Sequence, residues 1–165
     1  MQLAAFNALP AAQAGDLVRG CARIPSFVSA VTAGRPYAGL DELLATARAA
    51  AAGWTDEEVT AALADHPRIG ERPTGPGAGA AMSGREQAGV DPADEVLHRR
   101  LADGNRRYEE RFGRIYLVRA AGRSGAELLD LLEQRLGNDP ATERAVTREQ
   151  LAEIALLRLE GQITP

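Results

Sequence analysis

The stretch DHPRIGERPTGPGAGAAMSGREQAG, residues 65–89, concentrates side chains that can transfer protons or bind polar groups. His66 stands directly before a proline, and Ser83, Glu86 and Gln87 follow a segment rich in glycine and proline. An unperturbed imidazole titrates at about pH 6.5, so it exchanges protons at neutral pH. A glutamate beside it would orient the ring and favour its proton-bearing form. We interpret this stretch as a candidate site for proton transfer on a small, polar, anionic molecule.

The local sequence also predicts how these residues are presented. Pro67 disfavours helical geometry at His66, which places the histidine at the end of a helix. Residues 65–82 have the composition of a loop, and loops of this length are uncommon unless they are functional or disordered. The S-x-x-E pattern from Ser83 to Glu86 is typical of a capping box, so a helix is expected to begin at Ser83. Its free backbone N–H groups would then favour an anion.

Each of these residues also has a purely structural interpretation. A histidine before a proline at a helix end is more often structural than catalytic. Glu86 is the ordinary closing residue of a capping box, and Gln87 is ordinary on a solvated helix face. The segment rich in glycine and proline is also suited to a plain connector. The residue types alone therefore leave the enzymatic and structural interpretations open.

The rest of the chain is predicted to be helical, because its apolar residues recur at helical spacing. RIYLV at 114–118 is the exception, since it has the composition of a short β-strand. We expect one all-α domain over residues 1–165, a bundle of about seven to nine helices with a Gly/Pro-rich active-site loop. The expected helices cover residues 10–22, 24–34, 40–52, 55–64, 83 onward, 91–112, 124–137 and 140–160.

Composition narrows the class of protein. The chain has 165 residues, of which 45% are hydrophobic and 25% charged, and this balance is typical of soluble globular proteins. No apolar run approaches the roughly 18 residues of a membrane helix, and the N-terminus lacks the basic region of a signal peptide. We therefore expect a cytoplasmic protein without a membrane partner. The net charge of −4 argues against a nucleic-acid partner.

Several other residues have competing interpretations. The lone Cys21 excludes a CxxC metal pair and is expected to be a small buried hydrophobe, so no metal site is predicted. His98 lies in a charged stretch and is expected on a solvated helix face. Arg68 either pairs with Asp65 or reaches the site. Arg158 either projects toward a pocket or lies on the surface.

A set of motifs in register along the chain adds a resemblance. They are FNALP at 6–10, GRPY at 34–37, HPRIGE at 66–71, SGREQAG at 83–89, NRRYEERFG at 105–113, GRS at 122–124, LEQRLGND at 132–139 and EIALLRL at 153–159. With these motifs the chain resembles the 2-oxo-4-hydroxy-4-carboxy-5-ureidoimidazoline (OHCU) decarboxylases of uric acid breakdown. The resemblance covers nearly the whole chain, and HPRIGE is its most specific part.

The resemblance implies an all-helical homodimer that decarboxylates this small ureidoimidazoline to (S)-allantoin without a cofactor. It makes His66 the catalytic histidine, Glu86 its acidic partner and Arg158 the substrate-binding arginine. The chain departs from the family at Ile115, where many relatives carry proline, and at Arg119, where relatives often carry a small or apolar residue. The remaining substrate-lining residues that the resemblance implies are Pro67, Ser83, Gly84, Arg85, Gln87, Tyr116, Leu117, Val118, Arg119 and Ala120.

Two other functions stay open at this stage. The first is a helical interaction protein of the same fold without catalysis. Such a scaffold has no need to keep His66, Glu86, Gln87 and Arg158 together, and their joint presence favours the enzyme. The second is a related decarboxylase acting on another ureido or imidazoline acid, which the residues at 115–120 would decide.

Overall fold

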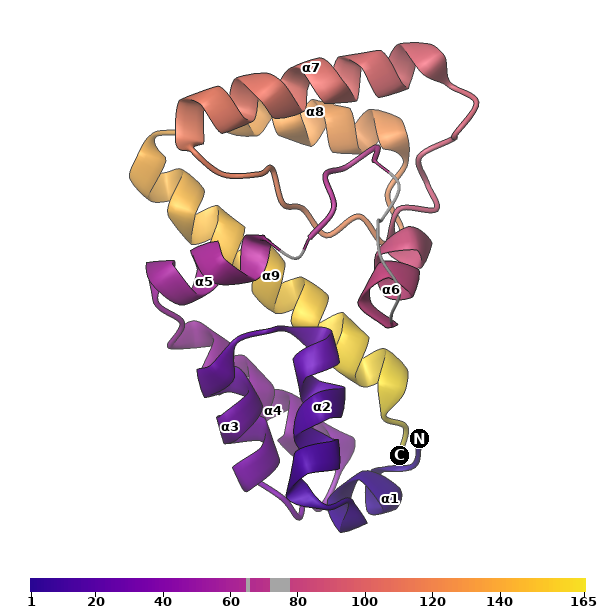
Figure 1. The fold of residues 1–165 in the computed structure, drawn as a ribbon, viewed down its shortest axis with the longest axis vertical. Helices are drawn as coiled ribbons and strands as arrows, with labels where there is room; N and C mark the ends of the chain where they lie inside the picture. Colours follow the sequence, from indigo (N-terminus) through magenta and orange to yellow (C-terminus); the bar gives the residue numbers. More distant parts are fainter. Residues whose placement is uncertain (65, 72–77) are drawn as a thin grey trace. The chain divides into compact units, whose positions relative to one another are not determined.

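The computed structural model describes residues 1–64, 66–71 and 78–165, and these residues form nine α-helices and no strand (Figure 1). The chain packs as two compact units. One contains residues 1–62 and 151–165, and the other contains residues 63–150. The last helix, α9 (Pro140–Gln162), contributes its first part to the second unit and its remainder to the first. The predicted all-α fold is confirmed.

The first unit is built by short amphipathic helices whose apolar faces meet. Val18, Phe27 and Leu43 are fully buried, and the Trp54 ring packs edge-on against Phe27 with 5.4 Å between ring centroids. The helices are α1 (Leu3–Ala8), α2 (Ala11–Cys21), α3 (Pro25–Ala33), α4 (Leu40–Ala52) and α5 (Asp56–Leu63), which ends at the unit boundary.

Two of the sequence motifs meet in this unit. Arg35 of GRPY donates from Nη1 to the carbonyls of Phe6 and Leu9, at 2.9 and 2.7 Å, which lie in and just after α1. Asn7 of FNALP exchanges hydrogen bonds with the backbone of Tyr37, at 2.8 and 2.9 Å. Both motifs therefore have a structural role here, because these hydrogen bonds join α1 to the segment between α3 and α4.

The second unit contains α6 (Ala78–Glu86), α7 (Glu95–Phe112), α8 (Gly125–Arg135) and the start of α9. Helices α7 and α8 pack side by side (Figure 1). Their close approach requires a glycine, because a Cβ on Gly104 would lie 2.5 Å from Cδ2 of Leu132. The buried core beneath them includes Leu101, Tyr108 and Leu128.

The helix starts test the capping predictions. The same T/S-x-x-E spacing forms capping boxes at Thr55 and Ser124, since each hydroxyl accepts from the backbone N–H three residues on and each glutamate accepts in return. The box at Ser83 is wrong: α6 begins at Ala78, so Ser83 lies inside the helix and offers no free N–H groups to an anion. The alanines between 78 and 81 are strong helix formers and extend the helix backwards. The long helix α7 starts at Glu95 and is capped by Asp94, a few residues after the expected start at Asp91.

The β-like segment RIYLV forms no strand; residues 115–120 run as irregular backbone within the unit. Side chains satisfy this backbone in place of a partner strand. Arg135 donates from Nη1 to the Leu117 carbonyl at 2.6 Å, and the Gln150 side chain accepts from the Arg119 N–H at 3.0 Å. The residue types favour a β-strand, but the described residues contain no neighbouring strand with which this segment could pair.

A buried ion pair joins α8 to α9. Arg135 donates from Nε to Oε1 of Glu143 at 2.8 Å, and the glutamate is fully buried. The Tyr108 hydroxyl donates to the same carboxylate, and Asn138 donates to its other oxygen at 2.8 Å. Burial, and then the hydrogen bond to Glu143, raise the pKa of Tyr108 to about 12. Every oxygen of the buried carboxylate therefore has a donor.

We expect Glu143→Ala to lower the free energy of unfolding by about 3–5 kcal/mol, because it leaves the Arg135 charge buried and unpaired. Urea denaturation followed by circular dichroism measures the change.

The matched control is Glu133→Ala, which removes the exposed ion pair with Arg107. Exposed pairs contribute about 0–1 kcal/mol, so this variant should unfold close to the wild type. Equal losses in the two variants would contradict the role given to the buried pair.

Candidate active site

The loop His66–Glu71 follows α5 and is fixed by Gln87, just after α6, and by side chains of α7. His66 is half-buried, and its backbone N–H donates to the Leu63 carbonyl at 3.1 Å. Gly70 has a positive φ of 86°, a conformation that favours glycine. The side chain of Gln87 accepts from the Gly70 N–H at 3.0 Å and donates to the Arg68 carbonyl at 3.4 Å. The amide of Gln87 thus holds the loop.

Helix α7 contributes two more contacts to the same loop. Asn105 is buried and donates to the Ile69 carbonyl at 2.9 Å. Arg68 binds Glu109 through two parallel hydrogen bonds, at 2.5 and 2.9 Å. The hydrogen bonds from Arg68 hold the pKa of Glu109 below its usual value. The loop backbone that follows His66 and Pro67 is therefore held at consecutive residues.

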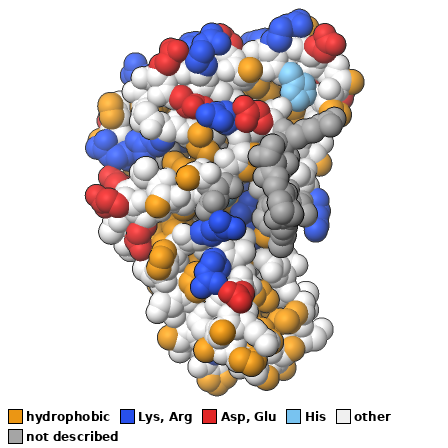
Figure 2. Space-filling model, viewed as in Figure 1, with side chains coloured by type: hydrophobic (Ala, Val, Ile, Leu, Met, Phe, Trp, Pro, Cys, Tyr) orange, Lys and Arg blue, Asp and Glu red, His pale blue; other side chains and the backbone are white. Residues whose placement is uncertain are grey.

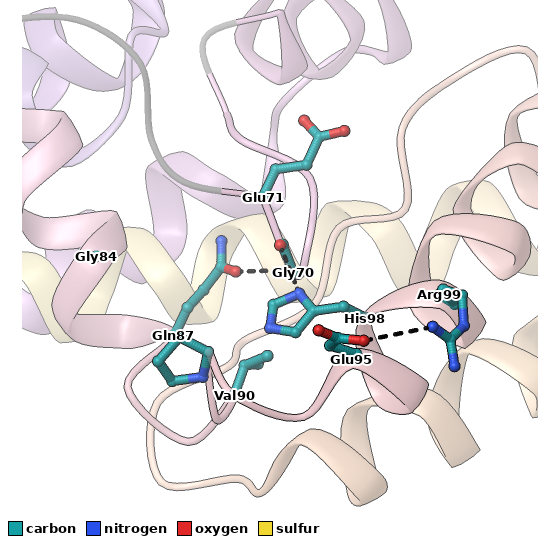
Figure 3. Close-up of a pocket in the computed structure, with 9 residues that line it drawn as sticks. Gly70, Glu71, Gly84, Gln87, Val90, Glu95, His98 and Arg99 are labelled. Carbon is teal, nitrogen blue, oxygen red and sulfur yellow. Dashed lines mark hydrogen bonds and ion pairs between the residues drawn. The ribbon is translucent and has the colours of Figure 1, made fainter.

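His98 also contacts this loop, so its predicted place on a solvated helix face is wrong. Its Nδ1 lies 3.1 Å from the Gly70 carbonyl and its Nε2 lies 3.0 Å from the Asp91 carbonyl. The ring is half-buried at the base of a pocket of about 650 Å³, whose wall also includes Gln87, Glu95 and Arg99 (Figure 3). No local pattern predicts this contact, because it depends on how the loop returns to α7.

Helix α6 presents the second group of predicted residues. Ser83 is only 5% exposed, and Glu86, one helical turn later, is half-buried on the same face. Gly84 and Arg85 are exposed. The structure thus gathers His66, Pro67 and the Ser83–Gln87 segment in one unit, with Gln87 linking the loop directly to the end of α6.

The segment 116–120 lies in the same unit but mostly in its core. Tyr116, Val118 and Ala120 belong to the buried apolar cluster, and Leu117 is buried too. Burial raises the pKa of Tyr116, whose hydroxyl donates to the Leu128 carbonyl at 3.2 Å. Arg119 is half-buried and donates to the Ala121 carbonyl at 3.2 Å. Of this segment's side chains, Arg119 alone is more than slightly exposed.

Arg158 belongs to the other unit, where it is buried and not on the surface. Its Nη1 donates to the Cys21 carbonyl at 3.5 Å. Burial raises the pKa of the Cys21 thiol to about 12, although the Arg158 charge opposes this. The cysteine is therefore the small buried hydrophobe expected from the sequence, since a thiol at this pKa is not ionised at neutral pH.

The described residues include no group of three His, Cys, Asp or Glu side chains able to hold a metal ion. None of the helices in the described part of the chain has the length and apolar composition to cross a bilayer. The face drawn in Figure 2 intersperses acidic and basic side chains. Arg106 pairs with Asp103 and Arg107 pairs with Glu133, so this part of α7 carries charges of both signs.

An all-α fold whose second unit holds the loop after His66 through Gln87, just past a helix that carries Ser83 and Glu86, defines a helical protein with a candidate site for acid–base chemistry. Comparison with known proteins makes the class specific. The family model described as OHCU decarboxylase matches residues 7–160. The chain belongs to the OHCU decarboxylase family, as its motifs predicted.

Individual relatives agree with this assignment. The chain is 32% identical over 151 residues to the 2-oxo-4-hydroxy-4-carboxy-5-ureidoimidazoline decarboxylase of Amia calva, covering 90% of this chain and 85% of that one. It is 30% identical over 102 residues to the uric acid degradation bifunctional protein TTL of Arabidopsis thaliana, covering 59% of this chain and 31% of that longer protein.

Solved structures support the fold. A crystal structure of OHCU decarboxylase in the presence of (S)-allantoin is similar with a TM-score of 0.73 and 25% identity, covering 86% of this chain and 93% of that one. A crystal structure of (S)-allantoin synthase has the same fold, with a TM-score of 0.73 and 17% identity over 99% of this chain and 54% of that one.

The ion pair between Arg68 and Glu109 predicts a pH dependence of stability. The lowered pKa of Glu109 stabilises the fold above the ordinary glutamate value of 4.5, and this contribution disappears as the pH falls through the lowered pKa. The difference in unfolding free energy between wild type and Glu109→Gln should therefore be full at pH 7 and shrink below pH 4.5. Urea denaturation at several pH values measures it; a difference that does not change with pH would exclude the pair as its source.

Proposed function

We propose that this chain converts OHCU to (S)-allantoin without a cofactor. Membership of the OHCU decarboxylase family supports the reaction, and the fixed loop His66–Glu71 beside α6 supports the place where it occurs. That loop is the observation on which the proposal depends, because its backbone is fixed just after the His66 imidazole, in the unit that also contains Ser83 and Glu86.

The substrate itself explains why no cofactor is required. The carbon that loses CO₂ carries a hydroxyl group and lies beside an imine carbon. When the bond to the carboxylate breaks, its electron pair moves into the ring and ends on the imine nitrogen. Protonation of that nitrogen and of the former imine carbon, together with loss of the hydroxyl proton, then gives allantoin, with a net uptake of one proton. Since the imine accepts the electrons, neither pyridoxal phosphate nor thiamine diphosphate is needed as a sink.

The enzyme must then orient the substrate and move protons on one face. We assign the proton transfer to His66 and the orientation of its ring to Glu86. The family resemblance supports Arg158 as the group that binds the substrate oxygens, because a guanidinium offers two parallel donors that a lysine does not reproduce. Pro67, Ser83 and Arg119 line the substrate. Gln87 also lines it, and its amide keeps the loop in place.

The family resemblance also supports a homodimer in the cytoplasm. Sedimentation velocity at micromolar concentration tests the oligomeric state, and a single monomeric species would contradict it.

We expect His66→Ala to lower kcat by about 10²–10⁴-fold, the usual contribution of a general acid–base group. The assay generates OHCU from urate with urate oxidase and the hydrolase that follows it. The circular dichroism of (S)-allantoin is then recorded against the slower, racemic spontaneous reaction. Wild-type protein that leaves this signal at the spontaneous rate would rule out the proposed function.

Two glutamate variants serve as the matched comparison. Glu86→Gln keeps the side-chain shape but removes the charge beside His66, and we expect it to lose turnover. Glu110→Gln makes the same change on the exposed face of α7 and should retain it. Equal turnover in both variants would remove Glu86 from the mechanism.

A further inference from the structure

His98 connects the loop that carries His66 to the turn that precedes α7. One ring nitrogen lies 3.1 Å from the Gly70 carbonyl and the other lies 3.0 Å from the Asp91 carbonyl. Figure 3 shows the ring beneath Gly70, with the Gln87 side chain reaching the same residue from the left of the view. Gln87 therefore contacts the N–H of Gly70, and His98 contacts its carbonyl.

The two contacts of His98 constrain which of its ring nitrogens carry a proton. A carbonyl oxygen only accepts hydrogen bonds, so both contacts are hydrogen bonds only when both ring nitrogens carry a proton. In that form the ring is a two-ended donor between backbone segments 21 residues apart in the chain, Gly70 and Asp91. No aliphatic side chain of this size makes such a link.

We propose that His98 is a positioning residue of the decarboxylation: it fixes the Gly70 end of the loop and so sets the orientation of His66. This rests on the function proposed above for His66. Gly70 follows His66 by four positions, and its left-handed backbone has no side chain of its own to anchor it. A small rotation there displaces the imidazole, and misplacement of a catalytic group by about 1 Å costs on the order of 10²-fold in rate.

The first test compares three variants by steady-state kinetics. We expect His98→Ala to lower kcat by about 10- to 100-fold with little change in KM, since substrate binding groups stay in place. His98→Gln keeps N–H donors on the side chain and should recover part of the loss. Arg99→Ala alters the same pocket wall next to His98, but the ion pair of Arg99 is with Glu95 on its own helix; this variant should retain wild-type turnover.

The second test is independent of the substrate. The chain has two histidines, so His98→Ala leaves His66 as its one imidazole, and ¹H–¹⁵N correlation of the ring reports on His66 directly. We expect the His66 ring resonances to move in His98→Ala and to stay in place in Arg99→Ala. Thermal unfolding of each variant separates a change of stability from a change of orientation.

These outcomes separate the two proposals. Unmoved His66 resonances in a folded His98→Ala protein, or an equal loss of kcat in Arg99→Ala, would overturn the role of His98. A wild-type protein without decarboxylase activity would instead overturn the proposed function, while the resonance test would still decide whether His98 orients His66.

Discussion

The buried carboxylate of Glu143 is the group on which the packing of the second unit depends. An unpaired charge at this site would be prohibitively costly, and Arg135 compensates it through Nε at 2.8 Å. Desolvation offsets much of the attraction in a buried ion pair, so the pair adds little net stability. Its main effect is to fix the orientation of the Arg135 guanidinium. With its Nε on Glu143, the guanidinium can reach the Leu117 carbonyl with Nη1, so the path of residues 115–120 follows from the pair.

The loop His66–Glu71 shows a different solution to the same problem. Its backbone groups are not paired in a helix or a sheet, so polar side chains must satisfy them. Gln87 and Asn105 do so through neutral amides, and Arg68 adds a charged link to Glu109. A loop held at consecutive residues loses little further freedom on binding a substrate, which suits an enzyme that relies on orientation and proton transfer alone.

The motifs that identify the family divide by their physical role. FNALP and GRPY join each other through Asn7 and Arg35, and LEQRLGND supplies the Arg135 side chain of the buried pair. These motifs stabilise the fold. HPRIGE and SGREQ instead hold the groups suited to proton transfer, although Gln87 within the second serves the loop as well. A motif match therefore identifies the family without showing which of its residues carry out chemistry.

The sequence by itself determined the all-α class, most helix positions, two of the capping boxes and the family, because these depend on local spacing and on side chains close together in the chain. It also placed Ser83 wrongly at a helix start and read a strand at 114–118. Tertiary structure decided what depends on partners far along the chain. Leu117 is paired by Arg135, His98 lies half-buried between the carbonyls of Gly70 and Asp91, and Arg158 is buried beside Cys21. Local sequence patterns do not predict such contacts, because each one forms only when segments far apart in the chain bring two polar groups within hydrogen-bond distance.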